Sequence, residues 1–209
     1  NCFLDIKSYM YCCFFDVDGV LLDFDRGFTK TIKEYFKLDI GDDYIPENFW
    51  FSDLLTKEQV VEGWDYFIKS NEFERLKPIV KPEHFNAKFG AYPVHFITNI
   101  PPDCLERRVK NLRNAGFKFK SAHCGGFINY EGKKSNTKAE VIQELLQENE
   151  SVIFVDDHPD NCKNVLESFP DAEIWLISRP FNTDFKHPGI RRADDWSEIL
   201  EHSVIPASH

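Results

Sequence analysis

The spacing of apolar residues predicts a chain in which short buried strands alternate with amphipathic helices. Five apolar runs are too short for helices and are bounded by polar residues, glycine or proline, which is typical of buried strands. These runs are residues 12–15, 94–98, 117–122, 152–155 and 174–178. Because parallel strands need helical crossovers, the alternation predicts an α/β fold with a Rossmann-like parallel sheet and helices on both faces.

Helix signals separate the later strands. Residues 105–112 place leucine and valine on one helical face, and Gly116 follows as a helix stop. Thr137 and Glu140 have the spacing of a capping box, which predicts a helix start at that point. A short third helix is expected over residues 161–169.

The alternation is interrupted after the first strand, because residues 21–92 contain no convincing strand. Phe28 and Phe36 lie on one face of an amphipathic helix, and Thr56 with Gln59 caps another. Such an insert is much longer than an ordinary connection between a strand and a helix, so we expect a small helical cap. The predicted division is an α/β core at 11–20 and 93–209, a cap at 21–92 and an N-terminal extension at 1–10.

Composition narrows the possible partners. Of the 209 residues, 42% are apolar and 29% are charged, as in a globular domain, and the net charge of −10 opposes binding to a nucleic-acid polymer. No apolar run approaches the roughly 18 residues of a membrane span. The six cysteines form no CxxC pair, and no signal-peptide pattern opens the chain, so we expect a reduced, cytoplasmic location.

Carboxylates follow two of the predicted strands. Asp16 and Asp18 come directly after the first strand, and Asp156 and Asp157 come after the fourth. Ligands of open α/β sheets gather at the carboxyl ends of strands, and converging carboxylates repel one another unless a cation lies between them. Oxygen ligands favour Mg²⁺. The simpler alternative is a set of solvated acids at turns and at a helix N-terminus.

Two further positions indicate phosphate binding. Thr98 and Asn99 end the second strand and could bind phosphate oxygens, although such a pair is also common in loops. Lys138 lies in the first turn of a predicted helix, where a cation is unfavourable by about 0.3–1 kcal/mol unless an anion is near. Lys133 and Lys134 are alternatives in the preceding loop, and a solvated surface lysine is the simpler interpretation.

Taken together and in this order, these features resemble the haloacid dehalogenase (HAD) superfamily of phosphohydrolases. The matching residues are Asp16-Val17-Asp18-Gly19-Val20, Thr98, Lys138 and Asp156-Asp157. The position of the helical insert is similar to the first cap position of that superfamily. The resemblance implies a Mg²⁺-dependent phosphatase that hydrolyses a small phosphomonoester through an aspartyl-phosphate intermediate.

The resemblance also implies a role for each matching residue. Asp16 is expected to be the nucleophile, and Asp18 the acid that protonates the leaving oxygen and then the base that activates water. Mg²⁺ is expected on Asp16, the Asp18 carbonyl and the acidic pair. Asp157 is favoured as the direct ligand because Asp157 and Asn161 fit the superfamily's spacing, and Asp156 is the alternative. Thr98, Asn99 and Lys138 are expected to hold the phosphoryl oxygens.

A narrower resemblance is to the 5'(3')-deoxyribonucleotidases. It is carried by residues 16–24, Gly27-Phe28, Asn48-Phe49-Trp50, Trp64, Asn71-Glu72-Phe73, residues 193–196 and Ile199-Leu200. It implies a nucleoside monophosphate whose base stacks on aromatic residues of the cap. The candidates are Phe24, Phe49, Trp50, Trp64 and Phe73. Alternatively these rings fill the cap's own interior, above all Trp64, which shares a helical face with Phe67.

Other functions remain open at this point. A HAD phosphatase for a sugar phosphate or another small metabolite fits the same motifs, and a non-catalytic phosphate-binding or signalling module would keep the fold. A response-regulator receiver carries its acidic pair on the first strand, whereas here Asp16 and Asp18 come first and the pair comes fourth.

Overall fold

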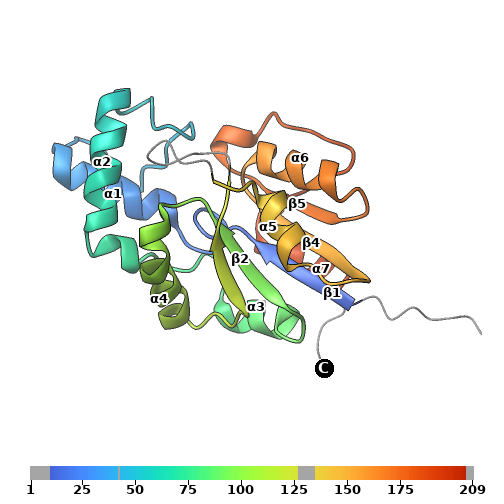
Figure 1. The fold of residues 1–209 in the computed structure, drawn as a ribbon. Coiled ribbons are helices and arrows are strands. Elements are labelled where there is room, and N and C mark those ends of the chain that lie inside the picture. Colours follow the sequence, from blue (N-terminus) through green and yellow to red (C-terminus); the bar gives the residue numbers. More distant parts are fainter. Residues whose placement is uncertain (1–9, 42, 127–134, 206–209) are drawn as a thin grey trace, which may run out of the picture.

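Six parallel strands form one sheet in the order β3-β2-β1-β4-β5-β6 (Figure 1). The computed structural model describes residues 10–41, 43–126 and 135–205. The strands are β1 (Met10–Phe15), β2 (Val94–Thr98), β3 (Ser121–Cys124), β4 (Glu150–Asp156), β5 (Glu173–Ile177) and β6 (Arg191–Ala193). The predicted α/β fold with a parallel sheet is confirmed.

Helices connect the strands and cover both faces of the sheet. The α-helices are α1 (Phe24–Phe36), α2 (Lys57–Lys69), α3 (Pro82–Phe89), α4 (Leu105–Ala115), α5 (Lys138–Leu145), α6 (Pro159–Ser168) and α7 (Trp196–His202). Three 3₁₀ turns are η1 (Glu72–Glu74), η2 (Pro102–Cys104) and η3 (Pro180–Asn182). Within the described ranges, no helix is both long and apolar enough to cross a membrane.

The central strand β1 is buried on both faces, which explains its unbroken apolar sequence. Successive side chains of a strand point to opposite faces. Cys12 and Phe14 therefore join the cluster under α5 and α6, whereas Cys13 and Phe15 join the cluster under α3 and α7. The five cysteines of the described chain are free thiols.

Local signals explain most boundaries. Both predicted capping boxes are present, at Thr56 and at Thr137, and Gly116 ends α4 in the left-handed conformation with φ +101°. The third predicted strand begins later than expected. Phe117 donates its backbone N–H to Leu112 O and closes the end of α4, and the chain then runs without regular structure to Ser121, where β3 starts.

The predicted insert contains a separate helical layer. Helices α1 and α2 stand together to the left of the sheet in Figure 1. The two chain segments that lead into and out of this layer pair with each other, because Ile79 N donates to Leu21 O at 2.8 Å. Helix α3 belongs to the predicted cap range but packs on the sheet, where the Phe85 ring centre lies 4.9 Å from that of Phe15. The exact division at residue 92 stays a prediction.

Candidate active site

Three buried carboxylates meet where β1 and β4 end side by side. Asp16 N donates to Val155 O at 2.9 Å, so Asp16 and Asp156 follow paired residues of neighbouring strands. One carboxylate oxygen from each of Asp16, Asp156 and Asp157 lies within 4.8 Å of the others. In this strand order, β1 and β4 flank the point where the chain direction across the sheet reverses, and ligands bind at such points.

Lys138 lies among these acids. Its ammonium donates to Asp156 Oδ2 at 2.7 Å and also to Asp16 Oδ1, and its side chain is 1% exposed. Burial alone would lower the pKa of Lys138, but Asp156 and Asp16 together raise it above its ordinary value. The structure thus places Lys138 inside the site as a permanent cation. Lys133 and Lys134, the alternatives, lie outside the described residues.

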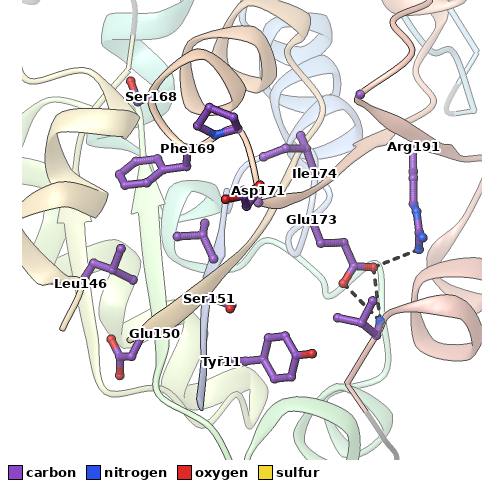
Figure 2. A pocket seen from close by; sticks show the side chains of 15 residues that line it. Tyr11, Leu146, Glu150, Ser151, Ser168, Phe169, Asp171, Glu173, Ile174 and Arg191 are labelled. Carbon is purple, nitrogen blue, oxygen red and sulfur yellow. Dashed lines mark hydrogen bonds and ion pairs between the residues drawn. The ribbon is translucent and has the colours of Figure 1, made fainter. Parts of the chain in front are cut away.

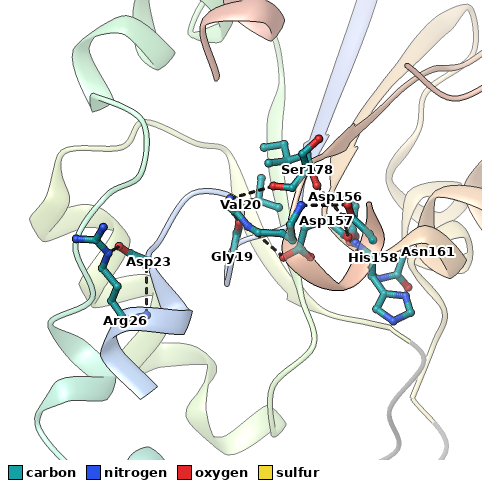
Figure 3. Close-up of polar contacts among 12 residues, drawn as sticks. Gly19, Val20, Asp23, Arg26, Asp156, Asp157, His158, Asn161 and Ser178 are labelled. Atoms are coloured by element: carbon teal, nitrogen blue, oxygen red, sulfur yellow. Dashed lines mark hydrogen bonds and ion pairs between the residues drawn. The ribbon is translucent and has the colours of Figure 1, made fainter. Parts of the chain in front are cut away.

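The two adjacent acids have different surroundings, which Figure 3 shows. The Asp156 carboxylate accepts from His158 N at 2.7 Å and from Asn161 Nδ2 at 3.2 Å, in addition to Lys138. The Asp157 carboxylate pairs with Arg179, whose Nε is 3.9 Å away. Asp156 is therefore held by protein donors, whereas Asp157 faces the site with little compensation.

Gly19 is required by the closeness of Asp157. Its φ is +86°, and a Cβ at this position would lie 2.2 Å from Asp157 Oδ2. Any other residue would need both a strained backbone and a displaced carboxylate. Gly19 thus lets the loop after β1 lie directly against the second acid (Figure 3).

The charged groups among the described residues do not balance the charge of the cluster. Burial, opposed by Lys138 and reinforced by Asp156, raises the pKa of Asp16 to about 7. Burial, together with Asp16 and Asp156, raises the pKa of Asp157 well above its usual value. Three carboxylates against the Lys138 ammonium and the more distant Arg179 guanidinium still leave excess negative charge at a site with only oxygen ligands. This donor set fits a hard divalent cation such as Mg²⁺.

Asp18 pairs with Arg108, a residue that the sequence motifs do not single out. Arg108 of α4 donates from Nη2 to Asp18 Oδ2 at 3.2 Å, and its Nε lies 3.1 Å from Oδ1. The Arg108 side chain has no exposed surface. The sequence carries a signal for it, because Arg108 shares the apolar face of the helix with Leu105 and Leu112 at helical spacing.

Thr98 ends β2 at the same edge of the sheet. Its side chain is buried, and Oγ1 has no hydrogen-bond partner among the described residues. Asn99 follows it, with its side chain against Gly126. A buried hydroxyl without a partner is costly and suits a ligand that supplies an acceptor or a donor.

Arg179 is a second cation outside the sequence motifs. It follows the end of β5, donates to the carbonyl of Gly19 and lies beside Asp157. Asp25 of α1 is also near, because Arg179 partly offsets the burial that raises the pKa of Asp25 to about 6. In the sequence, the signal that could have indicated Arg179 is its position just after a predicted strand, which it shares with other site residues.

Three of the five cap aromatics pack within the protein. Phe24 stacks on Phe28 with ring centres 5.3 Å apart, and Trp64 lies 5.9 Å from Phe24. Phe73 is fully buried, with the Arg108 guanidinium 3.9 Å from its ring centre. These placements match the alternative of an aromatic cap interior.

The other two cap aromatics lie in the loop before α2. The Phe49 ring centre is 5.2 Å from that of His158 and 5.4 Å from that of Phe181, so this loop meets the core beside the acidic pair. Trp50 is 55% exposed and lies 5.1 Å from Phe49. Of the five candidates, Trp50 alone is exposed, and Phe49 contacts core residues beside the acidic pair.

A large surface hollow lies at the opposite edge of the sheet (Figure 2). Its volume is about 850 Å³, and Tyr11, Glu150 and Glu173, at or near the starts of β1, β4 and β5, line it. Arg191 pairs with Glu173 there at 3.2 Å. None of the candidate site residues lines this hollow.

Comparisons with known proteins identify the fold. No protein-family model matches the chain, and no curated protein sequence matches it. Among solved structures, a haloacid dehalogenase-like hydrolase from Streptococcus pneumoniae is 20% identical over 81% of this chain and 85% of its own, with a TM-score of 0.53. A predicted phosphoglycolate phosphatase from Haemophilus somnus is 16% identical over 91% and 96%, with a TM-score of 0.57.

A third similar structure is YfnB from Bacillus subtilis, which is named as a HAD-hydrolase and has magnesium bound. It is 13% identical over 92% of this chain and 97% of its own, with a TM-score of 0.55. At these identities the likeness concerns the fold. The chain therefore has the fold of the haloacid dehalogenase-like hydrolases, with its buried acids at the carboxyl edge of the sheet.

Proposed function

We propose that this protein is a Mg²⁺-dependent phosphatase that hydrolyses a small phosphomonoester through an aspartyl-phosphate. The observation that carries the proposal is the buried cluster of Asp16, Asp156, Asp157 and Lys138. Burying several charged groups together is costly, and sites that do so are enriched in catalytic function.

In the proposed reaction, Asp16 attacks phosphorus and Asp18 protonates the departing oxygen. Asp18 then removes a proton from the water that hydrolyses the aspartyl-phosphate. Lys138 lies next to Asp16 and would offset the charge of the transferring phosphoryl group. The Thr98 hydroxyl, which has no partner in the described part of the chain, and the Asn99 backbone would bind the remaining phosphoryl oxygens.

Asp16, the Asp18 carbonyl and Asp157 would hold Mg²⁺. The choice of Asp157 over Asp156 is supported by their contacts, because Lys138, His158 and Asn161 already occupy the Asp156 carboxylate. When bound, the cation would neutralise negative charge on the phosphoryl oxygens.

We propose a sugar phosphate or another small metabolite phosphate as the substrate. The phosphoglycolate phosphatase name of one similar fold supports this class. Phe73 is fully buried, and Phe24 and Trp64 are half-buried against other rings, which reduces the surface on which a base could stack. A nucleoside monophosphate is the second candidate, favoured by the exposed Trp50 next to Phe49. We further propose a cytoplasmic location.

The decisive experiment is a phosphate-release screen over a panel of metabolite phosphates with Mg²⁺. We expect turnover that EDTA abolishes and Mg²⁺ restores. Full turnover in metal-free buffer, or no turnover of any ester, would contradict the proposal.

The two substrate classes are separated by comparing thymidylate and deoxyuridylate with hexose phosphates, in the wild type and in Trp50→Ala. If a base stacks on Trp50, the variant should lose about 1–3 kcal/mol of transition-state binding for nucleotides alone. We expect an indifferent variant and faster turnover of non-nucleotide esters. A nucleotide preference that disappears in Trp50→Ala would instead select the second candidate.

A further inference from the structure

Arg108 joins a core carboxylate to the base of the cap. One side of its guanidinium contacts Asp18, with Nη2 to Oδ2 at 3.2 Å and Nε to Oδ1 at 3.1 Å. Its Nη1 donates to the Phe73 carbonyl in η1 and to Asn111 Oδ1, the latter at 3.1 Å. The guanidinium plane also lies 3.9 Å from the centre of the Phe73 ring. Arg108 has no exposed surface, and the side chain of its partner Asp18 is 15% exposed.

The neighbouring Arg107 makes contacts of a different kind. It donates to the Ile68 and Ser70 carbonyls at the end of α2 and pairs with Glu74. Arg107 therefore binds the same cap segment as Arg108, but its carboxylate partner is Glu74 rather than Asp18. Because one arginine already fastens the cap to α4, docking alone does not explain why the second turns inward to a core carboxylate.

We propose that Arg108 is a positioning residue that holds the Asp18 carboxylate in the orientation needed for proton transfer. Through Arg108, this orientation also depends on the position of η1. A planar guanidinium beside both oxygens opposes rotation of the carboxylate, which a single point charge cannot do as well. The same guanidinium is held by the Phe73 carbonyl, so a shift of η1 moves the group that orients Asp18.

This inference rests on the proposed phosphatase function, in which Asp18 delivers a proton to the leaving oxygen. Proton delivery depends steeply on geometry, and it matters most for leaving groups that depart poorly as anions. An alkyl alkoxide needs the proton, whereas p-nitrophenolate departs without it. Loss of Arg108 should therefore harm alkyl esters selectively.

The test compares Arg108→Gln with Arg107→Gln, its matched control on the same helix and the same cap segment. The measured quantity is kcat/KM for glycerol phosphate, or the best alkyl ester of the panel, and for p-nitrophenyl phosphate. We expect Arg108→Gln to lose about 10–100-fold on the alkyl ester and less than about 3-fold on the aryl ester. Arg107→Gln should lose the same factor on both.

Arg108→Lys keeps a cation without the fork and should fall between the wild type and Arg108→Gln on the alkyl ester. It also serves if Arg108→Gln does not fold. Equal losses of Arg108→Gln on both esters, or the alkyl-selective pattern in Arg107→Gln, would overturn the proposal and leave Arg108 as a docking residue.

A second measurement is independent of turnover. In equilibrium unfolding, Asp18→Asn and Arg108→Gln should be non-additive when combined, whereas Asp18→Asn and Arg107→Gln should be additive. If no ester is turned over, the proposed function fails and the role of Arg108 in catalysis fails with it. The unfolding cycle would still decide whether Arg108 holds Asp18, and additivity there would overturn the pairing itself.

Discussion

The two edges of the sheet differ in how they treat charge. At the carboxyl edge, Asp16, Asp156, Asp157 and Lys138 are all buried. One oxygen from each of the three acids lies within 4.8 Å of the others, and Lys138 donates to two of them. At the amino edge, the hollow of Figure 2 has a volume of about 850 Å³, and Arg191 there pairs with Glu173 at 3.2 Å. Glu173 there is fully engaged by donors from several elements.

The comparison shows that a hollow on the surface does not by itself indicate a reactive site. An open hollow with satisfied polar groups has no reactive group left over. The carboxyl edge has an unbalanced charge, a hydroxyl of Thr98 without a described partner, and a glycine pressed against Asp157. Such unsatisfied features cost stability and are retained where a ligand will meet them.

The largest expected effect concerns the nucleophile. Asp16→Asn removes the attacking carboxylate with almost no change in size, and turnover should fall by at least about 10⁴-fold. Mass spectrometry of the wild type, quenched during turnover, should find the phosphoryl group on Asp16. A phosphoryl group trapped on another residue would contradict the assignment.

The next effect tests the buried cation. Lys138→Ala should lower kcat/KM by about 10²–10³-fold, because the transferring phosphoryl group loses a fixed positive charge. The matched control is Lys163→Ala, since Lys163 is an exposed cation on α6 that pairs with Asp160. Both are assayed with saturating Mg²⁺.

The structure also changes the expected stability of this variant. From the sequence, Lys138 should affect activity much more than stability, because a cation in a first helical turn is unfavourable. In the structure it is buried between Asp16 and Asp156, and removing one partner of a buried pair costs about 3–5 kcal/mol. Chemical denaturation should show this loss in Lys138→Ala and almost none in Lys163→Ala. If Lys138→Ala is stable and active, Lys138 is not the phosphate-binding cation, and another lysine must have that role.

A smaller effect follows from the raised pKa of Asp16. The folded chain keeps the Asp16 proton up to about pH 7, whereas the unfolded chain releases it near 3.8. Between these values the folded state binds more protons, so the contribution of Asp16 to stability falls as pH rises. In metal-free buffer, this contribution should be about 2 kcal/mol larger at about pH 5.5 than at about pH 7.5.

The control for this pH effect is the difference between the wild type and Asp16→Asn, which removes contributions from other groups. Mg²⁺ should reduce the difference, because the cation stabilises the ionised acids. A difference between the wild type and Asp16→Asn that stays unchanged from about pH 5.5 to about pH 7.5 would show that Asp16 is already ionised in the folded chain, with its charge compensated without metal.

The sequence predicted much of the carboxyl edge because buried parallel strands have an unmistakable pattern. Strands β1, β2, β4 and β5 were found as apolar runs, and their ends determine which residues share one edge. The short strand β6 has the sequence Arg-Arg-Ala and carries no apolar run, so it was missed. It forms because β5 offers an open edge with which it can pair.

Partners across the fold were harder to predict. The pairing of Arg108 with Asp18 joins residues 90 positions apart and depends on the rotation of α4 against the cap. The sequence places Asp156 and Asp157 at the same edge of the sheet. Which of the two contacts Lys138 depends on how their side chains are oriented at the end of β4. Asn161, expected from the resemblance to act with Asp157, instead donates to Asp156.

The smallest expected effect on activity tests the opposite edge. Figure 2 shows Glu173 beside Arg191, whose Nη1 donates to Glu173 Oε1 at 3.2 Å. Oε1 also accepts from Trp175 Nε1 at 2.7 Å, and Oε2 accepts from Val204 N at 3.1 Å. Glu173→Ala leaves these donors without an acceptor and should cost about 1–3 kcal/mol in the free energy of unfolding. This carboxylate binds the segment that follows α7 to β5, and it lies at the far edge of the sheet from Asp16. We therefore expect kcat/KM to stay within about 2-fold of the wild type. Denaturation and phosphate-release assays, both at a temperature where the variant is folded, measure the two quantities. A large loss of turnover in a folded Glu173→Ala would mean that the amino edge takes part in the reaction, and the contrast between the two edges would fail.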